Sequence, residues 1–165
     1  MELRLTFIVE NPYTLAVDAI VGCSSLTSLS LEHCPRRHSR EVEMFPFLEA
    51  LCEFFELAEV PLPALERLTL EMADRDGDMM SAQPHVCTRL ARALLSQGRY
   101  PRFRAVVVNI QPRKLSPRSG MWLRVQAQEL LEEDKQACLD RWRAAFSTFH
   151  EHPEVSLQVN VTCDH

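Results

Sequence analysis

The chain has 165 residues, of which 46% are apolar and 25% charged, so it is long enough for one domain with a substantial core. It contains no apolar run of membrane-spanning length and no secretory leader pattern at its start, and its six cysteines are scattered without a CxxC pair. These features predict a cytoplasmic or nuclear protein with reduced, mostly buried thiols and no membrane partner.

Hydrophobic periodicity predicts alternating strands and helices along the chain. In chain order they are a strand at 3–9, a helix near 12–21, a strand at 26–34, a helix at 46–58, a strand at 65–73, a helix between Pro84 and Gly98, a strand at 103–108, a helix at about 129–150 and a strand at 155–161. Strands joined by crossover helices run parallel in one sheet. The order therefore predicts an α/β fold.

Two strand segments share a leucine-rich pattern. Residues 26–34 fit L-x-x-L-x-L-x-x-N/C at every position, and residues 65–73 fit it with alanine at the last place. One face of these strands stays polar, at Thr27, Ser28, Ser30, Glu66, Arg67 and Thr69. Because strands of a doubly wound sheet are apolar on both faces, we expect an irregular leucine-rich-repeat solenoid, with a compact doubly wound α/β domain as the alternative.

The widest gap between strands contains an exposed basic loop, expected at 111–120. It is followed by the apolar run 121–125. We expect this run to form a strand over 121–127, either paired back as a hairpin or as an extra repeat, and the sequence leaves both open.

The repeats resemble the leucine-rich region of F-box proteins, in particular a large and loosely conforming fungal group. The residues that carry this resemblance are Leu26, Leu29, Leu31, Cys34, Leu65, Leu68 and Leu70. The resemblance implies the substrate-recognition part of a Skp–cullin–F-box ubiquitin ligase adaptor. The F-box itself is not detectable, since Leu62-Pro63 is similar to the Leu-Pro that opens one but leads into a strand. Residues 1–165 are expected to form a single leucine-rich-repeat-like domain. Because strands near both ends lack polar caps, the sequence leaves open a fragment of a longer array, a truncated gene model and a repeat-only protein.

Motifs for catalysis and metal binding are absent from the sequence. There is no G-x-S-x-G, H-E-x-x-H, G-x-G-x-x-G or Walker loop. The acidic turn 74–78 lacks the glycine and glutamate of a calcium loop, and Cys34 with His38 forms only half of a zinc pattern. We therefore expect no enzyme activity, no cofactor and no metal, with an unrecognised α/β enzyme as a remaining alternative.

The segment 99–124 carries seven basic residues and no acidic one, although the net charge of the whole chain is −5. It is a candidate surface for an acidic partner, with nucleic acid as the less favoured case. The candidate partner-binding residues are Arg99, Arg102, Arg104, Arg113, Lys114, Arg118, Trp122 and Arg124. Ser116, which precedes Pro117, is a candidate phosphorylation site. The function that the sequence favours is a non-catalytic scaffold for protein–protein interaction.

Overall fold

The computed structural model describes residues 1–8, 23–34, 44–57, 62–74, 84–96, 98–112 and 124–162. The expected helix near 12–21 lies outside these residues. Every structural statement below concerns the described part of the chain.

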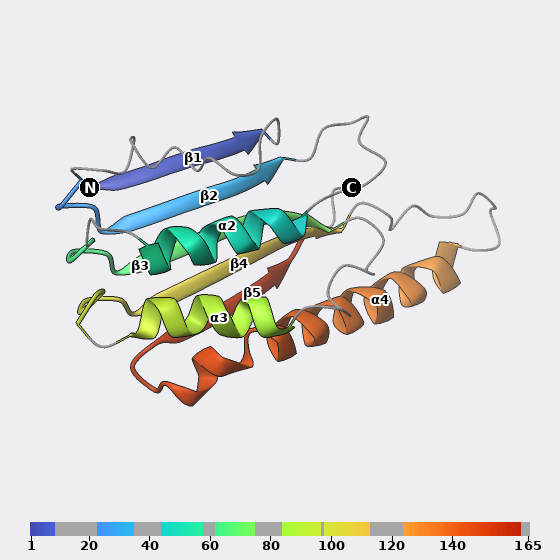
Figure 1. The fold of residues 1–165 in the computed structure, drawn as a ribbon. Coiled ribbons are helices and arrows are strands. Elements are labelled where there is room, and N and C mark those ends of the chain that lie inside the picture. Colours follow the sequence, from blue (N-terminus) through green and yellow to red (C-terminus); the bar gives the residue numbers. More distant parts are fainter. Residues whose placement is uncertain are drawn as a thin grey trace.

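Five parallel strands form one sheet, and their order in space is their order in the sequence (Figure 1). They are β1 (Glu2–Ile8), β2 (Ser28–Cys34), β3 (Arg67–Asp74), β4 (Ala105–Pro112) and β5 (Ser156–Val161). All four neighbouring pairs are parallel. The predicted α/β class with a parallel sheet is confirmed.

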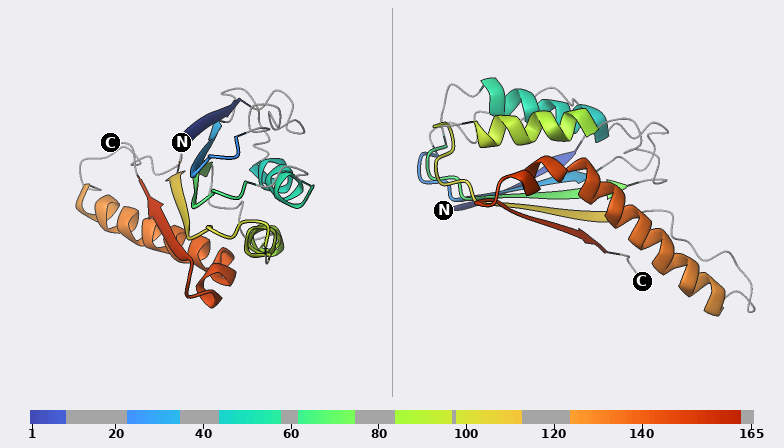
Figure 2. Two further views of the ribbon diagram at one scale, coloured as in Figure 1. Left: turned by 90° about the vertical axis from the view of Figure 1, so that its left-hand side faces the viewer. Right: turned by 90° about the horizontal axis from the view of Figure 1, so that it is seen from below.

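Three helices form the crossovers. They are α2 (Met44–Leu57), α3 (Pro84–Leu95) and α4 (Arg124–Ala145), the last followed by the 3-10 helix η2 (Ser147–Glu151). Helices α2 and α3 and the C-terminal end of α4 lie over one face of the sheet, whereas the N-terminal half of α4 leaves this layer beyond the strand ends (Figure 2). A doubly wound sheet reverses its strand order and carries helices on both faces. The described part shows neither feature, so it does not match the doubly wound alternative, and the leucine-rich-repeat assignment stays a prediction.

The core lies between the sheet and the helices, and equivalent residues of successive strands fill it. In register, Leu29 of β2 pairs with Leu68 of β3, which pairs with Val106 of β4, and all three are fully buried. Two residues further on, Leu31, Leu70 and Val108 form a second buried row. Burying one such side chain stabilises the fold by about 1.5–3 kcal/mol. The alternation seen in the sequence therefore corresponds to one core face and one outward face.

A tight turn precedes four of the strands and gives the chain its most regular repeat. In each turn a backbone N–H donates to the carbonyl three residues earlier, across residues 23–26, 62–65, 100–103 and 152–155, at 2.9 to 3.0 Å. The second turn residue is proline in three cases, namely Pro63, Pro101 and Pro153. Proline fits this position because its φ is already set for the turn. The Leu62-Pro63 pair is thus one copy of a repeated turn.

The last crossover differs from the sequence prediction in two places. The strand expected over 121–127 is wrong, because α4 begins at Arg124 and continues without a break to Ala145. From Gln126 to Lys135 every residue except Asp134 is a good helix former, and the stretch contains no glycine or proline, so it favours a helix over a strand. Gln111 and Pro112, the first two residues of the basic loop expected at 111–120, belong to β4, and residues 113–120 lie outside the described part.

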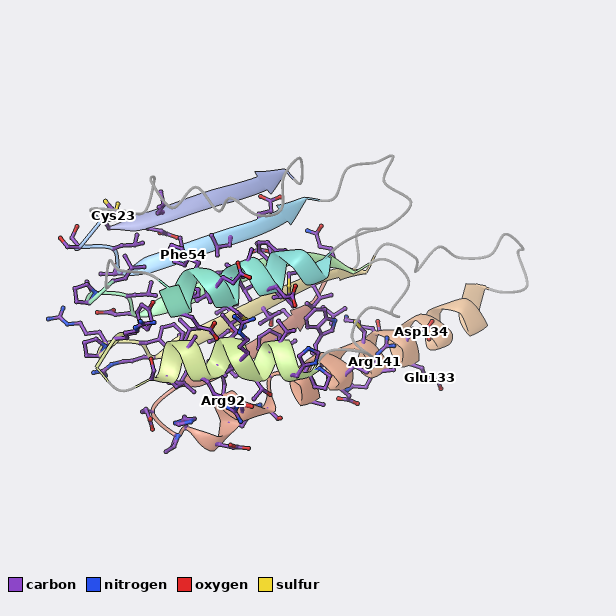
Figure 3. All side chains as sticks on the ribbon, viewed as in Figure 1. Cys23, Phe54, Arg92, Glu133, Asp134 and Arg141 are labelled. Carbon is purple, nitrogen blue, oxygen red and sulfur yellow. The ribbon has the colours of Figure 1, made fainter. Side chains whose placement is uncertain are left out.

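The buried side chains described for helix α4 all lie in its C-terminal half. Trp142, Phe146 and Phe149 are fully buried, and their rings stack in sequence with centroids 6.1 Å apart. The N-terminal half extends past the carboxyl ends of the strands (Figures 1 and 2). Glu133 and Asp134 lie on this extending part and are exposed (Figure 3). The predicted core position of Trp142 is confirmed.

Candidate interaction surface

The sheet face that points away from the helices is the candidate functional surface, and we call it the open face. No described helix lies across it (Figure 2). Its described side chains belong to every second strand residue. They are Glu2, Ser28, Ser30, Glu32, Arg67, Thr69, Glu71, Ala105, Val107, Asn109, Gln111, Ser156, Gln158 and Asn160. Most of these groups donate or accept hydrogen bonds, while the middle of the face carries small side chains.

A row of hydrogen-bonded side chains crosses three strands of the open face. The strand register aligns Glu71 of β3, Asn109 of β4 and Asn160 of β5. Asn160 Nδ2 donates to Asn109 Oδ1 at 2.7 Å, and Asn109 Nδ2 donates to Glu71 Oε1, also at 2.7 Å. At the far end, Gln158 Nε2 donates to Asn160 Oδ1 at 3.1 Å. Every donor in this amide row points toward Glu71, so the row fixes the orientation of that carboxylate.

Four side chains of β2 and β3 form a polar group beside the amide row, which we call the β2–β3 quartet. It consists of Ser30, Glu32, Thr69 and Glu71, with Ser30 next to Thr69 and Glu32 next to Glu71 in the register. Neighbouring strands are about 4.8 Å apart, so the two carboxylates lie side by side. Like charges placed directly opposite each other repel. The quartet thus places two carboxylates side by side, while the register places the basic residues Arg4 and Arg67 at neighbouring positions of the same face.

Ser30 has an unusual environment within the quartet. Its side chain faces away from the leucine core, between Leu29 and Leu31, yet it is only 9% exposed. Its hydroxyl makes no hydrogen bond to a described residue. A buried hydroxyl without a partner is costly, and most such groups in folded proteins are paired. Ser30 is therefore a hydrogen-bonding group that a bound partner is able to satisfy.

The basic residues predicted as one partner surface fall at two ends of β4. Arg102 and Arg104 are exposed in and after the turn before the strand, while Pro112 ends the strand at the opposite edge of the sheet. Residues 113–118 and Trp122, and with them Lys114 and Ser116, lie outside the described residues. Arg124 is the first residue of α4. A strand of eight residues is about 26 Å long, so the segment 99–124 spans the sheet.

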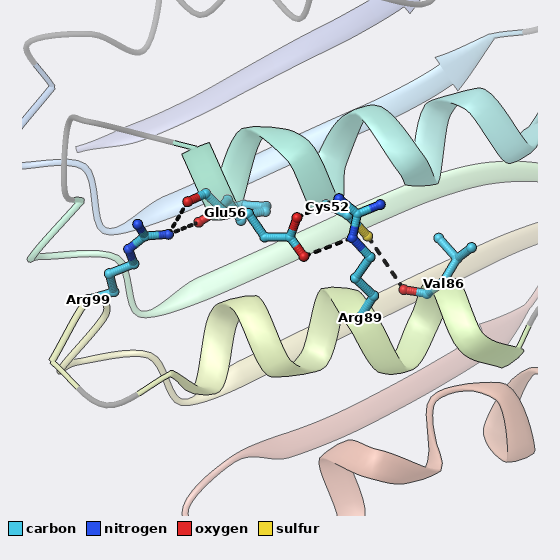
Figure 4. A network of polar contacts seen from close by, with 6 residues as sticks. Cys52, Glu56, Val86, Arg89 and Arg99 are labelled. Carbon is cyan, nitrogen blue, oxygen red and sulfur yellow. Dashed lines mark hydrogen bonds and ion pairs between the residues drawn. The ribbon is translucent and has the colours of Figure 1, made fainter.

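Arg99 has an internal role that the sequence did not indicate. Its guanidinium donates to the backbone carbonyl of Phe55 at 3.0 Å and to that of Glu56, both in the last turn of α2 (Figure 4). The hydroxyl of Tyr100 also donates to the carbonyl of Phe55, at 3.1 Å. Carbonyls at a helix C-terminus lack partners within the helix, and cations are favoured there. Arg99 and Tyr100 thus cap α2.

The two helices over the centre of the sheet are joined by an ion pair. Arg89 of α3 donates through Nε to Glu56 Oε1 at 2.8 Å and through Nη2 to Glu56 Oε2 (Figure 4). This hydrogen bonding is the main reason that the pKa of Glu56 is lowered from its ordinary value, and it raises the pKa of Arg89. The pair links α2 to α3 and lies on the helix side of the sheet, away from the open face.

The thiols between α2 and α3 are structural. Cys52 Sγ lies 3.4 Å from the carbonyl oxygen of Val86, and both Cys52 and Cys87 are fully buried (Figure 4). Burial raises the pKa of each thiol to about 12. A thiol with so high a pKa stays protonated at neutral pH and is a poor nucleophile.

The candidate metal ligands do not come together in the described structure. His150 is exposed and His152 half-buried near η2, at the amino end of β5, whereas Cys34 ends β2 at the opposite edge of the sheet. Among the described residues, no three histidine, cysteine or acidic side chains are grouped as a metal site would require. His38, Cys163 and His165 lie outside the described part.

The sequence contained a signal for the amide row that periodicity alone did not reveal. Glu32 directly follows the core residue Leu31, and Glu71 directly follows Leu70. At the same place in the later strands, Asn109 and Asn160 follow core valines. Comparing the residue that follows the last core position in each strand predicts a polar row. Only the three-dimensional structure shows that the members of this row are hydrogen-bonded to one another.

Within the described part of the chain, the helices are too short or too polar to cross a membrane. In comparisons with known proteins, no family model, curated protein or solved structure matches this chain.

Proposed function

We propose that the chain is a non-catalytic protein-interaction module that binds a partner protein through the open face. The observation that carries this proposal is a sheet face without a described helix over it that presents carboxylate, amide and hydroxyl groups. Parallel strands with helices on one side only hold such groups at fixed spacing on a rigid scaffold. Repeat proteins of strands and helices use surfaces of this kind for binding.

Charge favours a protein over nucleic acid as the partner. The strand register places the acidic residues Glu2, Glu32 and Glu71 on the open face together with the basic residues Arg4 and Arg67, which lie on different strands. Binding to a phosphate backbone requires clustered cations. Arg102 and Arg104 lie before β4 and Arg99 caps a helix, so the described cations of this segment do not form one cluster. This distribution supports a protein partner.

The resemblance to F-box proteins narrows the proposal to the substrate-recognition part of a ubiquitin ligase adaptor. In that case the open face holds the substrate, and an F-box elsewhere connects to the ligase. Affinity capture from the native cell with the full-length gene product is expected to recover Skp-type and cullin subunits. Recovery of a partner without any ligase subunit would remove the adaptor role and leave the interaction module.

Site-specific photo-crosslinking tests whether binding uses the open face. A photo-reactive residue is placed at Val107 on the open face or, as a control, at Arg92 on the exposed side of α3 (Figure 3). We expect a discrete crosslinked partner from position 107 only. An excess of unlabelled wild-type chain should compete, whereas the Thr69→Arg variant should not, because it places a long side chain in the middle of the face.

The matched competitor is Ala144→Arg, which adds the same side chain at an exposed position of α4. It should compete as well as the wild type. Crosslinking from position 92 alone, or equal competition by Thr69→Arg, would show that the partner does not bind the open face.

A further inference from the structure

We propose that the open face pairs with the open face of a second copy of the chain, around a two-fold axis that crosses the strands at the row of Thr69 and Val107. This inference rests on the proposed function and names a partner for the same face. It follows from the positions of two unlike charges on β3, from the small side chains between them and from the area of the face.

Two unlike charges lie on the open face of the middle strand, equally far from its central residue. Arg67 precedes Thr69 by two residues and Glu71 follows it by two, so all three side chains share one face of β3. Arg67 is exposed and makes no hydrogen bond or ion pair with a described residue. Glu71 accepts one hydrogen bond at Oε1, from Asn109. Four residues of a strand span about 13 Å, so the two charges are held apart within one chain.

A two-fold axis across the strands brings each of these charges to its opposite. The axis lies between two stacked sheets, passes over Thr69 and reverses the strand direction of the second copy. Positions before Thr69 in one copy then face positions after it in the other, so Arg67 faces Glu71 of the partner subunit on both sides of the axis. Stacked sheets lie about 10 Å apart, a gap that an arginine and a glutamate side chain together bridge. Hydrogen bonds between a guanidinium and a carboxylate are among the strong ones.

The side chains along the axis are small enough for two sheets to approach each other. Thr69 of β3 and Val107 of β4 are neighbours in the register, and both are half-buried. Ser30 of β2 continues the row on the other side of Thr69. In the two-fold arrangement each residue of this row faces its own copy. On β2, β3 and β4 the row carries no charge, so no like charges meet at the centre of the interface.

The other charges of the face are compatible with this arrangement. Glu32 of β2 already interacts with another residue of its own chain, so the pairing does not depend on it. On the edge strand β1 the register places one charge of each sign, Glu2 and Arg4. Twisted sheets that stack in an aligned way cross at about 30°, so they are closest at their centre. Strand β1 lies two strands from β3 and is therefore away from the closest contact.

The area of the face predicts a weak dimer. Five strands spaced by about 4.8 Å, with a rise of about 3.3 Å per residue, give a face of about 24 by 20 Å. Two copies therefore bury on the order of 1,000 Å² in total, which is the low end for a specific interface. We expect a dissociation constant on the order of 10–100 μM. A chain that holds another protein on this face is then released from its copy.

Charge-swap variants test the two-fold arrangement by sedimentation, over chain concentrations from well below to well above the expected dissociation constant. Arg67→Glu and Glu71→Arg should each weaken the dimer about 10-fold or more, because like charges then face each other across the axis. An equimolar mixture of the two variants should dimerise about as well as the wild type. In the mixed dimer, opposite charges again face each other at both contacts.

Matched controls carry the same changes away from the open face. Arg92→Glu on α3 and Glu133→Arg on α4 are at exposed positions and should leave the dissociation constant unchanged. Thermal unfolding shows whether each variant is folded. Photo-crosslinking needs no change of charge. A photo-reactive residue at Val107 in the purified chain should give a product of twice the chain mass, and the same residue at Arg92 should give none.

The outcomes distinguish this inference from the proposed function. A monomer at every concentration, an unchanged dissociation constant in either charge variant, or a mixture that fails to dimerise overturns the two-fold pairing. If crosslinking from position 107 captures a different protein from a cell extract in these cases, the interaction module remains. If the mixture dimerises and crosslinking in the extract captures only the chain itself, the pairing stands and binding of a different partner at the open face fails.

Discussion

Arg99, in the turn region before β4, and Glu56, in α2, both make contacts that stabilise the helix layer. Neither contact was predicted from the sequence. Arg99 was expected to meet a partner, but it donates to the last carbonyls of α2, which explains why a basic residue occurs at this place. Glu56 was unremarkable in the sequence, but it forms the ion pair with Arg89 that links two helices. Sequence patterns report periodicity and composition, and such contacts between distant residues leave no periodic signal.

Replacement of Arg99 by alanine is expected to lower stability and to leave partner binding through the open face unchanged. The variant loses hydrogen bonds to carbonyls at the end of α2, so the free energy of unfolding should fall by about 1 kcal/mol. Arg102→Ala is the control, because Arg102 is exposed in the neighbouring turn and should change stability by less than about 0.5 kcal/mol. Urea unfolding gives the free energy of unfolding of both variants. If Arg99→Ala is as stable as Arg102→Ala, Arg99 does not cap α2.

The Glu56–Arg89 pair predicts a pH dependence of stability. The pKa of Glu56 is lowered from its ordinary value of 4.5, so its contribution is present above that pH and is lost as the pH falls through the folded-state value. Both side chains are more than a third exposed, so Glu56→Gln should cost only about 0.5–1 kcal/mol at neutral pH. Thermal unfolding should show this difference from wild type shrinking below about pH 4.5.

The exposed Glu53 on the same helix provides a control for this pH series. Glu53→Gln should follow the wild-type profile more closely than Glu56→Gln does. A Glu56→Gln difference that stays constant into acid would mean that the ion pair does not stabilise the fold.

At the scale of elements, the repeated turn and the strand that follows it are the regular unit of this chain. Both ends of the strands were predicted within two residues, except the end of β4, which was expected at 108 and lies at Pro112. Alternation with period two is a direct consequence of one buried face. The prediction of a strand at 121–127 was wrong because a short, mostly apolar run fits both a strand and the first turns of a helix. The continuation of α4 to Ala145 decided it, since helix formation is cooperative along the chain.

The turn before β2 offers a stabilising substitution. Ser24 is exposed and occupies the place at which the other three turns carry Pro63, Pro101 and Pro153. Ser24→Pro should raise stability by about 0.4–1 kcal/mol, because proline reduces the freedom of the unfolded chain where the backbone already fits it. Ser25→Pro should destabilise, because proline does not suit the next turn position. Calorimetry compares the two, and an equal effect of both would contradict the shared turn geometry.

The two faces of β3 should respond very differently to truncation. Leu68 is fully buried at the centre of a row that crosses the sheet, so Leu68→Ala is expected to cost about 2–5 kcal/mol. Thr69→Ala, on the open face, should cost less than about 1 kcal/mol. Chemical denaturation gives both values. Similar losses at the two positions would mean that the open face is packed against something in solution.

At the scale of the whole molecule, the sheet grows by neighbour contacts only. Each strand pairs with the strands of the crossover units before and after it, so β3 is flanked on both sides and β5 on one side within the described part. Local opening is easiest where fewest contacts must break. We therefore predict slower amide hydrogen exchange in β3 than in β5 under native conditions, and equal protection in both strands would instead indicate a single cooperative unit.

The sequence by itself determined the α/β class, the strand positions, the buried aromatic stripe of α4 and the polar face at Ser30 and Thr69, because each follows from which side of an element is apolar. Tertiary structure decided that α2, α3 and the C-terminal end of α4 share one side of the sheet and that Arg99 caps α2. It also decided that Glu71, Asn109 and Asn160 form one row while the basic segment is divided by β4. These features join residues that are far apart in the chain, and only the parallel register of the strands brings them together or separates them.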